Sequence, residues 1–209
     1  ELSQKSADEF KQSKIEILAK LTKIRQICCD PSLVYSDYDG ESGKTDTCME
    51  LIESALSGGH RIIVFSQFVS MLSILEKKLK QRKIEFYKIV GETPKEERFK
   101  MVEEFNQNDV PIFLISLKAG GTGLNLVGAD VIIHYDPWWN EAAQNQATDR
   151  AHRIGQTKNV LVYKLIVKDT IEERILKMQE QKSKLADEIL SGKGMQSGIV
   201  DKDDLMNLL

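Results

Sequence analysis

Two stretches of the chain carry the residues best suited to phosphate chemistry. Residues 118–125 include three glycines in four positions, which allow a positive backbone φ and let N–H groups turn toward an anion. Gln146, Arg150 and Arg153 are spaced by four and three residues, so in a helix they form one polar stripe. The spacing alone leaves two alternatives open, which are a tight turn for the glycines and a solvated, ion-paired helix face for the stripe.

Two apolar runs are expected to position these residues. Ile112–Ser116 and Val131–His134 are short and rich in β-branched residues, as are strands that are buried on both faces of a parallel sheet. The glycine-rich loop follows the first run. Asp136-Pro137-Trp138-Trp139-Asn140 follows the second and leads into a helix that Asn140 can cap. Because open α/β sheets bind ligands at the carboxyl ends of their strands, both loops are predicted at the binding edge.

The rest of the chain alternates between helical and strand patterns. We expect helices over 46–57, 68–79 and 93–105, and further strands over 61–65, 84–89 and 160–167. Thr47 with Glu50, and Thr93 with Glu96, have the spacing of helix capping boxes. About five parallel strands with crossover helices predict an α/β fold, a doubly wound sheet with helices on both faces.

Amphipathic helices are predicted at both ends of the chain. Residues 13–28 place Ile17, Leu21, Ile24 and Cys28 on one stripe, and this helix ends before Asp30-Pro31. A long helix capped by Thr170 and Glu173 follows the last strand. We therefore divide the chain into a linker helix and loop (1–45), an α/β lobe (46–168), and a long helix with a flexible tail (169–209).

Composition restricts the class of protein. The chain has 209 residues and is 41% hydrophobic, enough for one domain with a core. No apolar run has the length of a membrane span and no signal peptide opens the chain, so we expect an intracellular protein, in the cytoplasm or nucleoid of a prokaryote or in the nucleus of a eukaryote. The three cysteines are expected to be free thiols, and no metal site is predicted. A net charge of −3 does not favour general nucleic-acid binding, although a local basic groove would suffice.

One short motif imitates a nucleotide-binding loop. Gly43-Lys44-Thr45 matches the end of a Walker A sequence, but the first glycine of that motif would fall at Tyr38 and no strand precedes it. The pairs Asp8-Glu9 and Asp187-Glu188 do not follow a hydrophobic strand, so neither is a Walker B carboxylate. A self-sufficient P-loop ATPase is therefore disfavoured.

Four ordered motifs between residues 62 and 156 resemble those of the Swi/Snf family of helicase-like, double-stranded-DNA-dependent ATPases of superfamily two. Residues 146–156 (QATDRAHRIGQ) resemble motif VI, 116–126 (SLKAGGTGLNL) resemble motif V, and 62–68 (IIVFSQF) resemble motif IV. DPWWN resembles the element between motifs V and VI. The resemblance implies the second, C-terminal RecA-like lobe of such an ATPase, whose final helix braces that lobe against the first.

The resemblance also implies roles for individual residues. Arg150 and Arg153 correspond to arginine fingers that reach ATP and magnesium held mostly by the first lobe of the same polypeptide. Residues implied near the nucleotide are Gly121, Gly123, Asn125 and Gln146. Residues implied at double-stranded DNA are Ser66, Gln67, Ser116, Lys118, Thr122 and Trp139.

Two positions depart from the family's pattern. Lys118 stands where many members have arginine, so a bidentate phosphate contact becomes a point charge. Glu141 replaces a proline that is common after the tryptophan loop. Trp139, the tryptophan that precedes Asn140, is implied to lie in the DNA minor groove and to couple hydrolysis to movement.

The function that these patterns predict is that of the second lobe of an ATP-driven translocase or remodeller of double-stranded DNA, catalytically incomplete alone, with a protein target of remodelling as a further partner. The alternative is a module that retains the lobe for DNA or protein binding without hydrolysis. The presence of both Arg150 and Arg153 argues against that alternative.

Overall fold

A computed structural model describes residues 7–120, 124–140, 144–145, 148 and 159–190. It begins with α1 (Ala7–Cys29), a short 3₁₀ turn η2 (Pro31–Leu33) and α2 (Gly43–Ser57). The strands and remaining helices then follow in chain order. They are β1 (Ile62–Ser66), α3 (Val69–Gln81), β2 (Phe86–Ile89), α4 (Lys95–Gln107), β3 (Ile112–Ser116), α5 (Leu117–Gly120), β4 (Val131–His134), β5 (Leu161–Lys164) and α7 (Ile171–Leu190).

The five described strands form one parallel sheet in the order β2-β3-β1-β4-β5. This arrangement confirms the predicted α/β class and the predicted bounds of β3 and β4. Every residue of β1, β3 and β4 is buried, which explains their continuous apolar sequences. β1 lies between β3 and β4, so the carboxyl ends of these three strands are neighbours.

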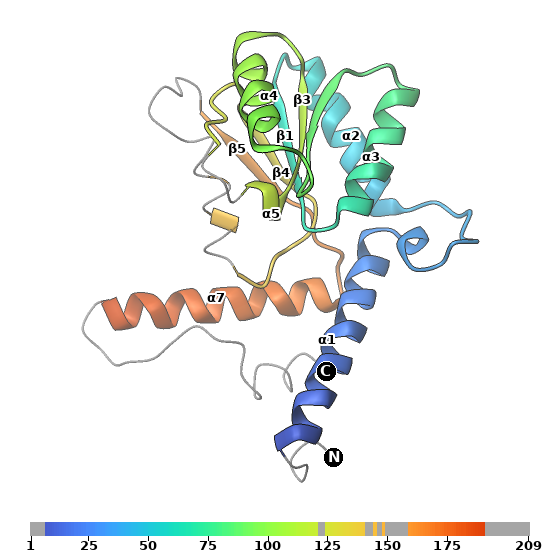
Figure 1. Cartoon of the computed structure of the whole chain (residues 1–209), viewed down its shortest axis with the longest axis vertical. Helices are drawn as coiled ribbons and strands as arrows, with labels where there is room; N and C mark the ends of the chain where they lie inside the picture. Colours follow the sequence, from blue (N-terminus) through green and yellow to red (C-terminus); the bar gives the residue numbers. More distant parts are fainter. Residues whose placement is uncertain (1–6, 121–123, 141–143, 146–147, 149–158, 191–209) are drawn as a thin grey trace.

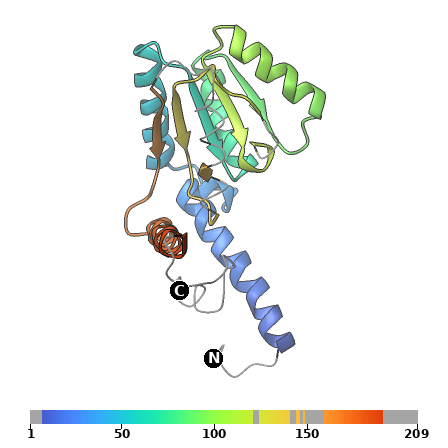
Figure 2. The same cartoon turned by 90° about the vertical axis from the view of Figure 1, so that its left-hand side faces the viewer.

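The sheet lies between helices on its two sides (Figure 2), and alternate residues of its central strands belong to two separate cores. On one face Ile62 and Val64 pack against α2 and α3, with Leu72 and Leu75 among the buried contacts. On the other face lie Ile63 and Phe65, with Val102 and Phe105 of α4 and the segment that follows β3. Helices therefore cover both faces of the sheet, as the doubly wound prediction requires.

The two long helices pack against each other below the carboxyl edge of the sheet (Figure 1). Ile171, Ile175 and Met178 of α7 form a third cluster with Leu21 of α1, and Trp139 packs against it. These three residues of α7 therefore pack against α1 and not against the sheet. That the helix also braces the lobe against another lobe stays a prediction.

The predicted apolar stripe of the first helix is wrong at one position. Ile24 is 44% exposed, whereas its neighbour Arg25 is only 1% exposed. The inversion is possible because Arg25 finds polar and aromatic partners inside the protein, so its charge does not have to remain in water.

The capping boxes predicted for α2 and α4 are wrong in position. α2 begins at Gly43, and the hydroxyl of Ser42 accepts the Thr45 N–H at 3.4 Å, so Thr47 lies inside the helix. α4 begins at Lys95, and the hydroxyl of Thr93 accepts the N–H of Val90 at 3.1 Å instead of capping the helix. The last strand is also shorter than predicted. The domain boundaries at residues 45 and 168 stay predictions.

A buried hydrogen-bond network attaches the end of α1 to the lobe. Tyr135, directly after β4, donates from its phenol to the carbonyl of Cys29 at 2.8 Å and lies 2.9 Å from the hydroxyl of Thr45. Thr45 in turn donates to Asp30 at 3.0 Å. Burial raises the pKa of Tyr135, so its phenol keeps its proton and remains a donor.

Tyr135→Phe should therefore destabilise the chain. The change removes the phenol's hydrogen bond to the buried Cys29 carbonyl, which then keeps only the longer contact from the Ser42 hydroxyl at 3.3 Å, and this costs about 1–3 kcal/mol in the free energy of unfolding. Urea unfolding followed by circular dichroism measures this, with Tyr163→Phe on the exposed strand β5 as the matched control. Equal unfolding midpoints for the two variants would mean that the network does not stabilise the attachment of α1.

Candidate functional site

Three loops meet at the carboxyl edge of the sheet, as the sequence predicts. In the parallel register Ser66 pairs with Ser116, and Phe65 pairs with His134. The residues after β1, the glycine-rich segment after β3 and the tryptophan loop after β4 therefore start side by side. This edge is where an open parallel sheet binds ligands.

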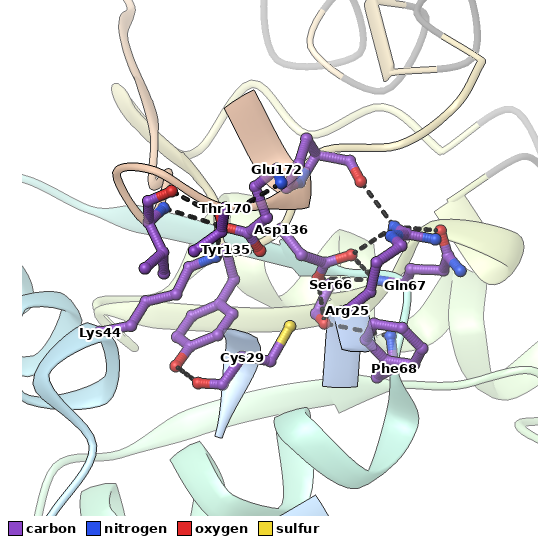
Figure 3. Close-up of polar contacts among 12 residues, drawn as sticks. Arg25, Cys29, Lys44, Ser66, Gln67, Phe68, Tyr135, Asp136, Thr170 and Glu172 are labelled. Carbon is purple, nitrogen blue, oxygen red and sulfur yellow. Dashed lines mark hydrogen bonds and ion pairs between the residues drawn. The ribbon is translucent and has the colours of Figure 1, made fainter. Parts of the chain in front are cut away.

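Asp136 is the buried centre of this edge (Figure 3). The Ser66 hydroxyl donates to its Oδ1 at 2.6 Å and the N–H of Gln67 donates to the same oxygen at 3.1 Å. A guanidinium nitrogen of Arg25 lies 3.6 Å from Oδ2. Burial raises the pKa of Asp136, while the Ser66 hydroxyl and the Arg25 cation oppose that rise. The carboxylate thus ties the ends of β1 and β4 to α1.

Arg25 reaches this centre from helix α1. Its Nη2 donates to Oε1 of Gln67 at 2.9 Å and to the carbonyl of Pro137 at 2.6 Å. Its guanidinium carbon lies 5.4 Å from the ring centre of Phe68 and 5.3 Å from that of Trp139. Burial lowers the pKa of Arg25, but a guanidinium is not deprotonated in proteins, so the group remains a cation.

Both tryptophans of the loop are half-buried, in different surroundings. Trp138 packs against the core on the α4 face, and Trp139 packs against the cluster between α1 and α7. The backbone of Trp138 is held twice. Its N–H donates to Oε1 of Gln144 at 3.2 Å, and its carbonyl accepts from the amide of Gln179 on α7. Both rings are therefore partly packed in the protein interior. The DNA role of Trp139 stays a prediction.

The glycine-rich segment begins with the single turn α5. Ser116 is buried and its hydroxyl accepts the Ala119 N–H at 3.4 Å, whereas Lys118 is exposed. Asn125 is exposed, and its carbonyl accepts from the side-chain amide of Asn106 at 2.8 Å. The other candidates in this loop, Gly121, Thr122 and Gly123, lie outside the described residues.

The candidates for DNA contact differ in their access to the surface. Lys118 is exposed, and Gln67 and Trp139 are half-buried. Ser66 and Ser116 are buried, and their hydroxyls are used within the protein. A direct contact of these two serines with DNA stays a prediction that their burial does not support.

The polar stripe predicted from Gln146, Arg150 and Arg153 lies outside the described residues. Gln144, just before this stripe, makes a hydrogen bond typical of a helix, because its N–H donates to the carbonyl of Asn140, four residues earlier, at 3.2 Å. The hydroxyl of Thr148 donates to the Gln144 carbonyl at 3.3 Å and lies 2.9 Å from Nε2 of His134. These contacts connect the start of the segment to β4.

Lys44, the lysine of the apparent Walker A sequence, is committed to an ion pair (Figure 3). Its amine donates to both carboxylate oxygens of Glu172 on α7, at 2.6 and 2.7 Å, and lies 5.2 Å from the ring centre of Tyr135. Glu172 also accepts the Val167 N–H at 2.9 Å. Lys44 therefore joins α2 to α7, and its surroundings give no support to a phosphate loop.

Sequence reasoning missed Arg25, Asp136, Gln144 and Gln179. The signal for Arg25 was present, because it follows Leu21 by four residues and so borders the apolar stripe. Asp136 was visible as a carboxylate just past a buried strand. The two glutamines carry no pattern that separates them from surface residues.

The described part of the chain offers no group of three or more His, Cys, Asp or Glu side chains that could hold a metal ion. Nor is any described helix both long and apolar enough to cross a membrane.

The five-stranded parallel sheet with helices on both faces places the chain among the RecA-like α/β lobes. The sequence model described as "Helicase conserved C-terminal domain" matches residues 43–155, which is more than half of the chain. The chain belongs to this family, and within it to the C-terminal ATPase lobes of the Swi/Snf type.

Relatives and solved structures agree with this assignment. The chain is 40% identical over 188 residues to an uncharacterized ATP-dependent helicase of Mycoplasma pneumoniae, covering 88% of the chain and 18% of that protein. It is 41% identical over 170 residues to the human chromatin-remodeling ATPase INO80, covering 81% of the chain and 11% of INO80. The chain thus spans less than a fifth of the length of these two relatives.

The solved SWI2/SNF2 ATPase core of Sulfolobus solfataricus in complex with double-stranded DNA is 38% identical to the chain. It superimposes with a TM-score of 0.73 and covers 91% of this chain and 40% of that one. The C-terminal part of the Fun30 ATPase domain superimposes with a TM-score of 0.63 at 31% identity, covering 83% and 64% respectively.

His134, at the end of β4, should make stability depend on pH. Burial lowers its pKa to about 4, and its ring stacks on Phe65. Below its ordinary pKa of about 6.5 the unfolded chain takes up a proton that the folded chain refuses, so this contribution is complete above about pH 6.5 and is lost as pH falls toward 4. We expect a loss of about 1–3 kcal/mol in unfolding free energy between pH 7 and pH 4.5.

His134→Gln removes the titrating group while its amide can still reach Thr148. Unfolding in urea at several pH values should show a flatter decline for this variant than for the unsubstituted chain. Parallel declines would assign the acid sensitivity to carboxylates elsewhere.

Proposed function

We propose that the chain acts as the second ATPase lobe of an ATP-driven translocase of double-stranded DNA. The observation that carries the proposal is the convergence of three loops at one sheet edge, those after β1, β3 and β4. Each of these loops carries one of the family's motifs. The similarity to a SWI2/SNF2 core in complex with double-stranded DNA supports DNA as the ligand.

In this proposal the chain contributes cations to ATP hydrolysis, and the nucleotide is held mainly by another lobe. Arg150 and Arg153 approach the γ-phosphate as charge develops on it, with Gln146, Gly121, Gly123 and Asn125 near the nucleotide. An arginine finger contributes roughly 10³–10⁵ to the rate in related nucleotide hydrolases. Magnesium would neutralise phosphate charge when bound with ATP on that other lobe.

The DNA contacts in this proposal are made by the exposed Lys118, by the half-buried Gln67 and Trp139, and by Thr122. Lys118 offers a point charge to a backbone phosphate, and Gln67 and Thr122 offer hydrogen bonds. Trp139 provides an aromatic surface for the minor groove. Ser66 and Ser116 hold the loops that carry these residues, because their hydroxyls bond to Asp136 and to the Ala119 N–H.

A module that binds DNA or protein without hydrolysis is the second candidate. It would need neither arginine of the polar stripe, yet both Arg150 and Arg153 are present. The two candidates differ in whether these guanidinium groups affect turnover. Substitution of one of them therefore separates the candidates.

Arg153→Ala, made in the protein that carries both lobes, should abolish most ATP hydrolysis while ATP and DNA binding stay nearly unchanged. The reason is that the cation is needed mainly in the transition state, so a loss of about 10³-fold or more in kcat is expected. Steady-state hydrolysis with saturating duplex DNA measures it, alongside equilibrium binding of both ligands. Arg82→Ala, at the exposed end of α3, is the control.

Two results would contradict the finger assignment. Normal turnover in Arg153→Ala would support the non-hydrolysing module or another source of the cation. A lowered unfolding temperature with parallel loss of binding would make Arg153 a structural residue.

The 209-residue chain by itself should bind DNA weakly and show no DNA-stimulated hydrolysis. Its printed sequence contains neither a Walker A nor a Walker B motif, so the nucleotide lacks its cradle and its magnesium ligands. Phosphate release with and without duplex DNA measures this, with the two-lobed protein as the positive control. DNA-stimulated turnover by the chain alone would overturn the division of labour between lobes.

A further inference from the structure

Arg25 is the one fully buried arginine among the described residues, and it lies on a helix outside the lobe's sheet. Its partners come from two loops at the binding edge. It contacts Gln67 and Phe68 after β1, and Asp136, Pro137 and Trp139 after β4. A single side chain of α1 thus joins two loops that carry family motifs.

We propose that Arg25 is a positioning residue that fixes the loop of residues 136–139 relative to α1, so that the placement of α1 is transmitted to Trp139. The inference rests on the proposed function, in which Trp139 meets DNA. It goes beyond that function by naming the contact through which α1 acts on Trp139.

The geometry favours an arginine over a lysine at this position. Nη2 donates to Gln67 Oε1 at 2.9 Å and to the Pro137 carbonyl at 2.6 Å, while the group lies 5.3 Å from the Trp139 ring centre. A planar guanidinium can donate in its plane and present its faces to aromatic rings at once. A lysine amine is a point charge on a flexible stem, so it can keep the charge without fixing the loop.

The loop is also held from α7. Gln179 donates its amide to the Trp138 carbonyl, one residue from the carbonyl that Arg25 holds. Because α1 and α7 share the cluster of Leu21, Ile171 and Ile175, a shift in their packing reaches two consecutive carbonyls of the loop. The loop therefore moves with this helix pair.

The placement of Trp139 can be measured without any activity. The chain has two tryptophans, so Trp138→Phe leaves Trp139 as the only one. In that background, emission maximum and acrylamide quenching are compared for the parent, Arg25→Met, Arg25→Lys and Lys23→Met. Lys23 lies two residues away on the exposed face of α1 and is the matched control.

We expect Arg25→Met to shift the emission to longer wavelength and to raise quenching. Arg25→Lys should show a smaller change in the same direction, and Lys23→Met none. Unchanged emission and quenching in Arg25→Met would overturn the proposal. If Arg25→Met does not fold, Arg25→Lys decides, and a spectrum identical to that of the parent would then overturn it.

Coupling is measured in the protein that carries both lobes, as triplex displacement per ATP hydrolysed. Arg25→Met should lower this ratio about tenfold while kcat for ATP changes far less, in the range of couplings measured through packed networks. Arg25→Lys should recover part of the ratio, Lys23→Met all of it, and Trp139→Ala serves as the uncoupled reference.

A purely structural role for Arg25 predicts a different result. Hydrolysis and displacement would then fall together, with a lowered unfolding midpoint and an unchanged ratio, and this would overturn the proposal. If the unsubstituted two-lobed protein shows no DNA-stimulated hydrolysis, the proposed function has failed. The quenching comparison still decides whether Arg25 positions Trp139.

Discussion

The buried carboxylate of Asp136 is the constraint on which the binding edge depends. A carboxylate removed from water costs several kcal/mol unless donors and a cation compensate for its lost hydration. Here the Ser66 hydroxyl, the Gln67 N–H and Arg25 supply that compensation. Because these donors come from β1 and α1 while the acceptor follows β4, the charge can be satisfied only when all three elements are in place. The need of the Asp136 carboxylate for these partners thus fixes the relative position of the loops.

A second polar network makes the helices outside the sheet part of the same unit. Lys44 pairs with Glu172, and Tyr135 bonds to the Cys29 carbonyl and to Thr45, so α1, α2 and α7 all contact one region of the lobe. Both members of the Lys44–Glu172 pair fall outside the predicted lobe of residues 46–168. The linker helix and the last helix are therefore packed against the lobe through buried polar contacts, in addition to the apolar contacts between themselves.

The sequence predicts the sheet well because strands that are buried on both faces are continuous apolar runs, which can be recognised locally. β3 and β4 are short apolar runs rich in β-branched residues, and their bounds agree with the prediction to the residue. The cap of α2 was misplaced because the hydroxyls of Ser42 and Thr45, near the true start of the helix, also donate to Cys29 and Asp30, and no local pattern encodes these partners. Arg25 was missed for the same reason, since a charged residue is buried only if distant groups satisfy it. Roles for Arg150 and Arg153 came from resemblance to a family and not from spacing.

The nature of the Arg25 contact bears on how force could pass through the lobe. Apolar residues of similar volume often stabilise a site as well as a buried ion pair does, so stability alone does not require arginine here. What a guanidinium adds is direction, because Nη2 donates to two loop oxygens while the group lies near two aromatic rings, and these contacts hold together only over a narrow range of loop positions. An apolar contact would let the loop slide along α1 at little cost. A directional one makes the loop and the helix move together, which is the property that the coupling role proposed for Trp139 needs.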